Sequence, residues 1–285
     1  MRGIRSLLFV PGDSPRKFEK AKSSGADALI LDLEDSVAAE AKPEARGRVS
    51  AMLDARAEGQ AMYVRVNAFD TGLTLADLHA VVGKADGIML PKCAGGADVR
   101  RLSHHLDAFE VAAGAEPGRT KILAIATESS RSLFSLGEYR ESGDRLAALV
   151  WGAEDLATDV GAFEKRDASG FHSPFRLARD LCLFAATAAG VAAIDTVYID
   201  IPDLTGLATE AKAARRDGFH AKMSIHPSHI EAINQAFGAS ETELSWARRV
   251  VAAFDANPTS GALRIDGRMI DIPHLALARK LLARV

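Results

Sequence analysis

Few residues of this sequence could support a disulfide, a zinc site or a membrane span. The 285 residues include only two cysteines, Cys93 and Cys182, which lie far apart and match no zinc-binding spacing. We therefore expect a cytoplasmic protein with reduced thiols. The longest mostly apolar run, residues 181–194, is too short to cross a bilayer and predicts a buried helix. The first apolar run, residues 7–10, is too short for the core of a signal peptide.

The sequence also lacks a strong charge imbalance and the common nucleotide-binding motifs. Its formal net charge is −3, which gives no general attraction to nucleic acid or to anionic membranes. No G-x-G-x-x-G follows the first apolar run, and no Walker A lysine motif occurs. The content of 48% hydrophobic and 26% charged residues is ordinary for a globular protein. The expected partners are therefore small molecules, with no nucleic acid and no membrane.

Short apolar or β-branched runs recur along the chain and alternate with stretches of helical spacing. We predict strands at residues 7–10, 28–33, 62–66, 87–90, 122–126, 147–151, 196–201 and 222–225. The helical stretches include residues 15–24, 43–57, 75–82, 98–113, 174–189 and 204–217. Most of the strands are continuously apolar, which is typical of strands buried on both faces. Repeated strand–helix units predict a parallel sheet, because parallel neighbours need crossover connections.

The chain length favours a closed sheet over an open one. Eight strand–helix units fit a (β/α)8 TIM barrel, which typically takes about 250 residues. We predict this barrel over residues 1–230 and a C-terminal helical extension over residues 231–285. An open, doubly wound parallel sheet is the alternative, although neither nucleotide-binding motif supports it.

Nearly every predicted strand ends in a charged or polar residue. These residues are Asp32, Glu34, Asp35, Arg65, Asn67, Lys92, Glu128, Glu154, Asp155, Asp200, Asp203 and His226. In an α/β barrel, the carboxyl ends of the strands meet at one rim, where active sites lie. A charged group is costly to bury unless it is paired or bound to metal. A salt bridge or a helix cap could explain any single residue, but their convergence at one rim predicts an active site.

The residue types at this rim indicate a particular chemistry. Many carboxylates with no cysteine or histidine cluster suit a hard cation such as Mg²⁺ rather than zinc. Such a metal can polarise a bound carbonyl or hydroxyl group. Arg65 offers a forked set of donors for a substrate carboxylate. The sequence therefore predicts cleavage or formation of a bond beside a carboxylated carbonyl.

Eight segments in sequence order resemble the citrate lyase beta-subunit-like family. They are RSLLFVPG (5–12), LDLEDSV (31–37), VRVN (64–67), MLPK (89–92), ATES (126–129), WGAEDLATDVG (151–161), GFHAKMSIHPSHI (218–230) and DGRMIDIPHLALARKLL (266–282). The family includes citryl-CoA and malyl-CoA lyases, a malyl-CoA thioesterase and malate-synthase-like members. The resemblance implies a (β/α)8 barrel that forms a homotrimer or hexamer and acts on a coenzyme A thioester.

The resemblance also implies roles for residues of this chain. Glu128 and Asp155 match the two carboxylates that bind Mg²⁺, and Arg65 matches the arginine that holds the substrate carboxylate. Asp271 matches a C-terminal acid that reaches an active site, in several members that of the neighbouring subunit. It is expected to be the general base, or to activate water in a thioesterase. Two basic residues match positions near the acyl or CoA end: Arg5 and Lys92.

Structural roles are the alternatives for these residues. The metal pair could form ion pairs across the barrel mouth, and Arg65 could be a structural partner of nearby acids. These acids follow the second strand and are Asp32, Glu34 and Asp35. They could lie near substrate or could orient the basic groups from behind. Asp271 precedes Ile-Pro and could cap the last helix. Lys17, Lys20 and Lys22 are predicted to lie on a solvated helix face, with binding of a CoA phosphate as the alternative.

The sequence and the resemblance together predict a Mg²⁺-dependent CoA-ester lyase. Its expected substrate is a short 3-hydroxyacyl-CoA such as malyl-CoA, citramalyl-CoA or citryl-CoA, and the bond breaks or forms through a thioester enolate. Three alternatives stay open at this point. They are a thioesterase on the same site, a metal-dependent pyruvate aldolase acting on free acids, and a citrate lyase beta subunit that needs a carrier protein.

Overall fold

The chain folds into two compact units. The computed structural model describes residues 1, 3–167 and 169–283. One unit is Ile4–Ala236, and the other joins Met1–Gly3 to Phe237–Val285. The boundary therefore lies at 236/237 rather than at the predicted 230/231. The reason is helix α9 (Ile230–Phe237), whose Asn234 accepts a hydrogen bond from Ser6 Oγ (2.7 Å) and donates one to the carbonyl of Gly25 (2.9 Å).

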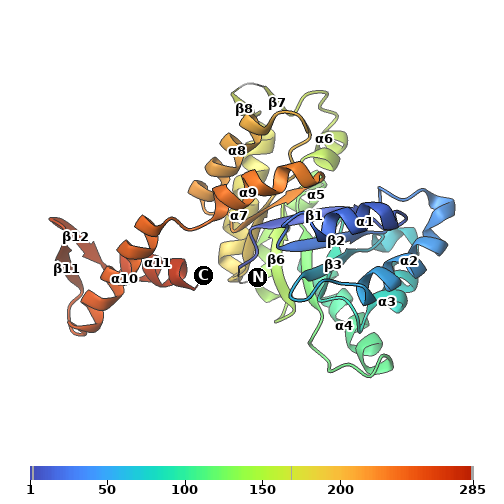
Figure 1. Cartoon of the computed structure of the whole chain (residues 1–285), viewed down its shortest axis with the longest axis horizontal. Coiled ribbons are helices and arrows are strands. Elements are labelled where there is room, and N and C mark those ends of the chain that lie inside the picture. The colour runs from blue at the N-terminus through green and yellow to red at the C-terminus, as the bar shows by residue number, and fades with distance from the viewer. Residues whose placement is uncertain (2, 168, 284–285) are drawn as a thin grey trace. The chain divides into compact units, whose positions relative to one another are not determined.

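The larger unit is built on a closed barrel of eight parallel strands (Figure 1). The strands are β1 (Ser6–Pro11), β2 (Ala28–Asp32), β3 (Ala61–Arg65), β4 (Gly87–Leu90), β5 (Lys121–Ile125), β6 (Leu146–Val150), β9 (Ala192–Asp195) and β10 (Ala221–Ser224). Their order around the barrel is β1-β10-β9-β6-β5-β4-β3-β2, and β1 closes the ring on β10. The closed ring confirms the predicted (β/α)8 barrel and excludes the open sheet.

Helices connect the strands and lie outside the ring (Figure 1). They are α1 (Pro15–Lys22), α2 (Lys42–Asp54), α3 (Thr74–Val81), α4 (Gly96–Ala112), α5 (Ser130–Leu133), α6 (Glu154–Val160), α7 (Ser173–Ala189) and α8 (Leu204–Asp217). Short 3-10 turns occur at Ala39–Ala41, Phe69–Thr71, Leu136–Glu141 and Pro227–His229. A small hairpin of β7 (Arg166–Asp167) and β8 (Gly170–Phe171) follows α6. None of the helices in the described part of the chain has the length and apolar character needed to cross a bilayer.

The seventh barrel strand does not lie at residues 196–201, where β-branched residues predicted it. Strand β9 is Ala192–Asp195, and all four of its residues are buried. The predicted segment is the loop that follows β9, and Ile199 is 50% exposed there. The run at residues 181–194 is likewise not one helix, since α7 ends at Ala189 and β9 begins at Ala192. Both errors arise because alanines have little preference for strands, while burial against neighbouring strands fixes the observed pairing.

The smaller unit contains two helices and a hairpin. The helices are α10 (Glu241–Asp255) and α11 (Ile272–Leu282), and the hairpin joins β11 (Ala262–Ile265) to β12 (Arg268–Asp271). The predicted helical extension thus also contains antiparallel strands. Asp266 and Gly267 form the hairpin turn, and both have positive φ angles of 51° and 77°. An Asp-Gly pair suits such a turn, because glycine accepts this conformation at no steric cost. The core of the smaller unit is formed by Ala247, Val250, Phe254, Ile270, Leu275, Ala278 and Leu281.

Candidate active site

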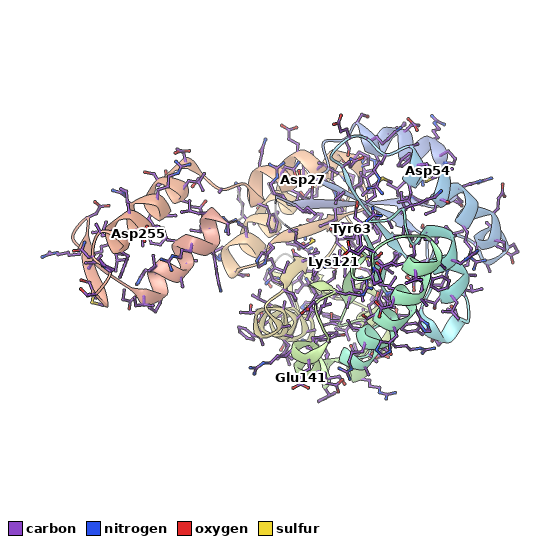
Figure 2. All side chains as sticks on the ribbon, turned by 90° about the horizontal axis from the view of Figure 1, so that it is seen from below. Asp27, Asp54, Tyr63, Lys121, Glu141 and Asp255 are labelled. Carbon is purple, nitrogen blue, oxygen red and sulfur yellow. The ribbon has the colours of Figure 1, made fainter. Side chains whose placement is uncertain are left out.

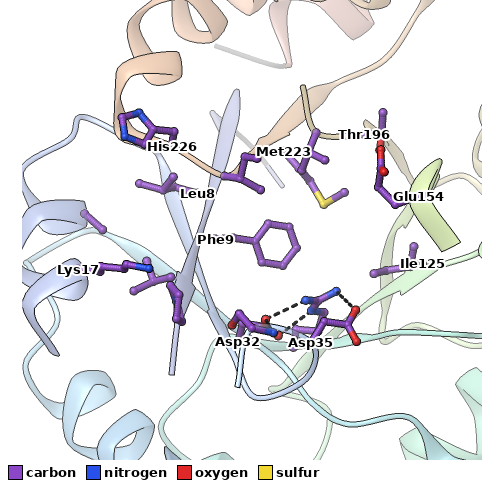
Figure 3. A pocket seen from close by; sticks show the side chains of 18 of the residues that line it. Leu8, Phe9, Lys17, Asp32, Asp35, Ile125, Glu154, Thr196, Met223 and His226 are labelled. Carbon is purple, nitrogen blue, oxygen red and sulfur yellow. Dashed lines mark hydrogen bonds and ion pairs between the residues drawn. The ribbon is translucent and has the colours of Figure 1, made fainter. Parts of the chain in front are cut away.

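A cleft of about 610 Å³ opens at the carboxyl ends of the barrel strands (Figure 3). One part of its wall is apolar and includes Phe9, Ile125 and Met223, whose side chains point into the cleft in Figure 3. The polar lining is formed by Lys17, Lys20, Asp32, Asp35, Arg65, Glu128, Glu154, Asp155 and His226. Most of the residues predicted from the strand ends thus meet at one rim, as strand direction requires. Lys17 and Lys20 are exposed on α1 and line this cleft, in addition to facing solvent.

Asp32 and Arg65 form a two-pronged ion pair at the rim. The register of the barrel places them side by side, since Asp32 is opposite Arg65 where β2 and β3 end. Arg65 Nε and Nη2 donate to the two oxygens of Asp32 at 2.7 and 2.8 Å. The guanidinium also lies 4.9 Å from the centre of the Phe9 ring. Burial alone lowers the pKa of Arg65, but the hydrogen bonds and charge of Asp32 outweigh it and raise the pKa above its ordinary value.

Two more acids of the loop after β2 surround Arg65 Nη1. Glu34 Oε2 lies 3.0 Å and Asp35 Oδ2 lies 3.5 Å from this nitrogen. Glu34 is buried, while the side chain of Asp35 is 56% exposed. Burial raises the pKa of Glu34, although Arg65 and Lys92 oppose the change. In this structure Arg65 pairs with the nearby acids, as its structural alternative predicts. Arg65 also lines the cleft, where a ligand can reach it.

Lys92 connects the acids of the loop after β2 to the opposite side of the cleft. Its Nζ lies 2.5 Å from Glu34 Oε1 and 3.7 Å from Asp155 Oδ1. Its backbone N–H donates to Glu128 Oε2. The residue has a φ angle of 50°, in the left-handed region that disfavours a lysine. Burial lowers its pKa, but the bond and charge of Glu34 dominate and raise the pKa above the ordinary value, so the amine is cationic.

Glu128 is a buried carboxyl group beside other acids. It follows β5 and is only 6% exposed. Burial raises its pKa to about 8, the nearby charges of Asp155 and Glu34 add to this effect, and the Lys92 N–H opposes it. Gly152 provides the space for this side chain, because a Cβ at Gly152 would lie 2.8 Å from Glu128 Cγ. The ionised form of Glu128 thus has too little positive charge nearby to offset its burial and the neighbouring acids.

The donor set of the cleft fits one hard divalent cation. Asp155 lies in the first turn of α6, lines the cleft with Glu128, and has a side chain that is 35% exposed. Magnesium commonly takes one or two protein carboxylates and completes its shell with water and substrate oxygens. Among the described residues, no group of three histidine, cysteine or acidic side chains could enclose a metal by itself. The pair therefore matches an open magnesium site rather than a closed structural one.

Arg5 does not lie at this rim. It precedes β1 and pairs with Asp27, which precedes β2 and is labelled in Figure 2; Arg5 Nε and Nη2 each lie 2.9 Å from an oxygen of Asp27. Both residues are thus at the amino ends of the strands, opposite the cleft. Within this chain a strand thus separates Arg5 from the rim, and a role for Arg5 at the acyl or CoA end stays a prediction.

Asp271 lies in the smaller unit and caps helix α11. Its side chain accepts a hydrogen bond from the backbone N–H of His274, and His274 Nδ1 contacts the same carboxylate. The side-chain bond with His274 lowers the pKa of Asp271. The capping role considered as the alternative is therefore present.

The sequence reasoning missed a second layer of polar residues behind the loop after β2. Lys42 begins α2 and donates to the carbonyls of Leu33 and Glu34 and to the side-chain oxygen of Asn67. Asn67 in turn bonds to Asp77. A signal was available in the sequence, since a lysine in the first turn of a helix opposes the helix dipole and needs a specific reason to be there.

Comparison with known proteins identifies the family of this chain. The family described as HpcH/HpaI aldolase/citrate lyase matches residues 5–227. The chain belongs to this family. The match confirms the resemblance seen in the sequence. The matched residues include the barrel strands and every rim residue named above.

Relatives within the HpcH/HpaI aldolase/citrate lyase family extend the similarity over nearly the whole chain. A citrate lyase subunit beta-like protein of Mycobacterium tuberculosis is 37% identical over 97% of this chain and 94% of its own length. A (3S)-malyl-CoA thioesterase of Cereibacter sphaeroides is 34% identical over 99% and 94%. The structure of CitE from M. tuberculosis in complex with magnesium, acetoacetate and coenzyme A matches with a TM-score of 0.77, at 35% identity over 99% of this chain and 98% of that one. The family contains lyase- and aldolase-type enzymes, and a thioesterase is among the relatives.

Proposed function

We propose that this protein is a Mg²⁺-dependent CoA-ester lyase. It cleaves or forms the carbon–carbon bond of a short 3-hydroxyacyl-CoA such as malyl-CoA, citramalyl-CoA or citryl-CoA. The observation that carries the proposal is Glu128, a buried carboxyl group whose pKa is raised to about 8 beside Asp155 in the rim cleft. A carboxyl group in this position needs a cation to ionise at neutral pH. The relatives named for citrate lyase and for malyl-CoA support the choice of substrate class.

Each rim residue has a task in the proposed reaction. Glu128 and Asp155 hold Mg²⁺, which when bound polarises the oxygen atoms of the acid at the reacting centre. Arg65 binds the carboxylate of that acid, and Asp32 orients the guanidinium. Lys92 supplies a fixed positive charge beside Glu34 and Asp155. The apolar wall formed around Phe9 excludes water from the neutral part of the substrate.

The proton transfer is assigned to Asp271 of a neighbouring subunit in a homotrimer or hexamer. In the cleavage direction, the carboxylate accepts the hydroxyl proton of the substrate. The bond between the α and β carbons then breaks, and its electron pair forms the enolate of the thioester. Protonation of the enolate gives acetyl-CoA, and the other fragment leaves as a 2-oxo acid. Asp271 is ionised at neutral pH, as a general base must be, and the side-chain bond with His274 lowers its pKa further.

Coenzyme A is proposed to enter over α1. Lys17 and Lys20 are exposed cations at the edge of the cleft and suit a phosphate group. The CoA-containing structure of the M. tuberculosis relative supports a CoA substrate for this chain. The assignment requires no membrane partner and no nucleic acid, and a cytoplasmic location is proposed.

Product analysis by mass spectrometry tests the proposal. The purified protein is incubated with malyl-CoA, citramalyl-CoA and citryl-CoA, each with Mg²⁺ or with EDTA. Acetyl-CoA that forms only with Mg²⁺ supports the lyase. Turnover that persists in EDTA, or full activity in both Glu128→Ala and Asp155→Ala, refutes the metal assignment.

A thioesterase on the same site is the second candidate, because the C. sphaeroides relative carries that name. In this case water attacks the thioester carbonyl and displaces the CoA thiol, so the products are free CoA and the intact hydroxy acid. The same mass spectra separate the two reactions. Turnover of free 4-hydroxy-2-oxo acids without CoA would instead indicate an aldolase. Activity that appears only with an acyl carrier protein would indicate a carrier-dependent beta subunit.

A further inference from the structure

Lys42 is an ammonium group bound by three oxygen atoms of the barrel rim. Its Nζ lies 2.8 Å from the carbonyl of Leu33, 2.7 Å from the carbonyl of Glu34 and 2.6 Å from Asn67 Oδ1. An ammonium group has three N–H donors, so these three oxygens use all of them. Both carbonyls belong to the loop after β2, the segment of residues 33–37, which we call the β2 loop.

A chain of buried contacts fixes the position of this ammonium group. Asn67 donates from its backbone and its side chain to Asp77 Oδ2, at 2.8 and 2.7 Å. Asp77 is fully buried, and its other oxygen accepts from Arg46 Nε at 2.7 Å. Asn67 Nδ2 also donates to the carbonyl of Leu33 at 3.0 Å. The network therefore connects α2 and α3 to the end of β3 and to the β2 loop.

The β2 loop holds the acids that contact the proposed substrate-binding groups. Glu34 places its carboxylate 3.0 Å from Arg65 Nη1 and 2.5 Å from Lys92 Nζ. Lys42 holds the backbone of the same residue from behind. A change in the Glu34 backbone would therefore shift a carboxylate that contacts both Arg65, which lines the cleft, and Lys92. Rigid support of this kind typically changes activity when it is removed.

The place of Lys42 in the sequence is unfavourable for the helix itself. It is the first residue of α2, where the positive end of the helix dipole disfavours a cation. Glutamine or serine would suit the helix better, so the contacts with the β2 loop explain the lysine. We propose that Lys42 is a positioning residue for the reaction, which sets the β2 loop and through it the geometry of Glu34 and Arg65. The effect of Lys42 on the reaction rests on the proposed function, whereas its effect on the β2 loop does not.

Two measurements on Lys42→Met test the inference. Hydrogen exchange followed by mass spectrometry reports on the loop directly, because the amides of Leu33, Glu34, Ser36 and Val37 are all hydrogen-bonded in the structure. We expect faster exchange in peptides that contain residues 33–37 and unchanged exchange in peptides that contain β5. We also expect the KM for the acyl-CoA substrate to rise by about 10- to 100-fold, because Arg65 holds the acid before and during the reaction.

Lys84→Met is the matched control. Lys84 Nζ also makes two side-chain contacts, with Ser50 Oγ at 2.9 Å and with Asp54 Oδ2 at 2.6 Å, and both partners lie on α2. It precedes β4 and so lies at the end of the barrel away from the cleft. This variant loses an ion pair and a hydrogen bond of a lysine to α2 without touching the β2 loop. Its KM should equal that of the wild type even if its melting temperature falls.

Restoring the ammonium group provides a stricter test. Lys42→Cys can be alkylated with 2-bromoethylamine, which gives a side chain with the length and charge of lysine. The native thiols Cys93 and Cys182 are buried and should not react. We expect aminoethylation to return the KM toward the wild-type value and alkylation with iodoacetamide to leave it raised.

The outcomes separate this inference from the proposed function. Unchanged exchange of the β2 loop with an unchanged KM in Lys42→Met overturns the inference, even if the wild type is an active lyase. A raised KM in Lys84→Met of similar size overturns it as well, because the effect would then be one of general stability. If the wild type turns over no acyl-CoA, the proposed function fails, and the exchange of the β2 loop alone decides the role of Lys42.

Discussion

Replacing Glu128 by glutamine should stabilise the metal-free protein, and the gain should grow as the pH rises. Glu128 is buried, and its pKa is raised from 4.5 to about 8. Between these two values the folded state keeps a proton that the unfolded state has released. The free energy of unfolding of the wild type therefore falls as the pH rises through this window. A glutamine at the same position has no such dependence and can still accept the N–H of Lys92.

The pKa shift sets the size of the effect. Because the pKa of Glu128 is raised from 4.5 to about 8, its full ionisation above pH 8 lowers the free energy of unfolding by about 5 kcal/mol. At pH 7 the loss is about 3 kcal/mol, and at pH 5 it is below about 1 kcal/mol. The stability difference between variant and wild type should therefore widen by a few kcal/mol from pH 5 to pH 8.

Urea denaturation at pH 5, 6, 7 and 8 in EDTA measures this difference. The chain contains two tryptophans, Trp151 in the barrel and Trp246 in the smaller unit. A Trp246→Phe background leaves Trp151, which is fully buried, as the reporter of barrel unfolding. Added Mg²⁺ should stabilise the wild type by about 2.7 kcal/mol at 100 times its dissociation constant. The Glu128→Gln variant should lose most of this gain.

The control replaces an exposed acid by its amide. Glu58 is exposed and lies away from the strand ends, so Glu58→Gln should change stability little at any pH. A difference between Glu128→Gln and wild type that stays constant from pH 5 to pH 8 would refute the argument. It would mean that Glu128 is ionised without cost in the metal-free protein.

Three further predictions concern other residues. Arg65→Lys keeps the charge but loses the forked bond to its aspartate, so kcat/KM for the acyl-CoA should fall about 100-fold in steady-state assays, and a fall below threefold would contradict the role. Glu128→Ala and Asp271→Ala should each be inactive, yet mixing and refolding them together should restore part of the activity if the base comes from a neighbouring subunit; no recovery would place the base elsewhere. Glu110→Gln should cost about 3 kcal/mol in urea melts at pH 7, because Arg145 would lose a buried partner. Burial raises the pKa of Glu110, but the bonds from Arg145 and Thr120 prevail and lower it to about 2, so this stability should persist above pH 4.5 and disappear as the pH falls toward 2.

The barrel could be predicted because its strands are buried on both faces. Continuous apolar runs such as residues 28–31 favour buried strands, and their spacing leaves room for one helix between neighbours. The seventh strand was misplaced because local preference and tertiary burial disagree there. Strand β9 begins with two alanines, which are weakly strand-forming, while the following β-branched residues lie in a loop in which Ile199 is exposed.

The location of the rim residues could be predicted from strand direction alone, and the same rule places Arg5 away from the rim. Asp32 and Arg65 end neighbouring strands, so parallel pairing brings them together. Arg5 begins a strand, and direction places it at the other end of the barrel. Lys42 could not be found in this way, because its role depends on which carbonyls a helix start faces after folding. The catalytic assignment of Asp271 depends on contacts between chains, which strand patterns do not encode.

The left-handed backbone of Lys92 has a consequence for engineering this protein. Stabilising schemes often replace non-glycine residues of positive φ by glycine, which relieves about 1 kcal/mol of backbone strain. In the described part of the chain the candidates are Lys92 and Asp266, with φ angles of 50° and 51°. At the hairpin turn the exchange would remove the ion pair of Asp266 with Arg249, whereas at Lys92 it would remove the ammonium group beside Glu34 and Asp155. A library selected for heat resistance alone would thus be drawn toward glycine at position 92, and only a simultaneous selection for turnover would keep the lysine.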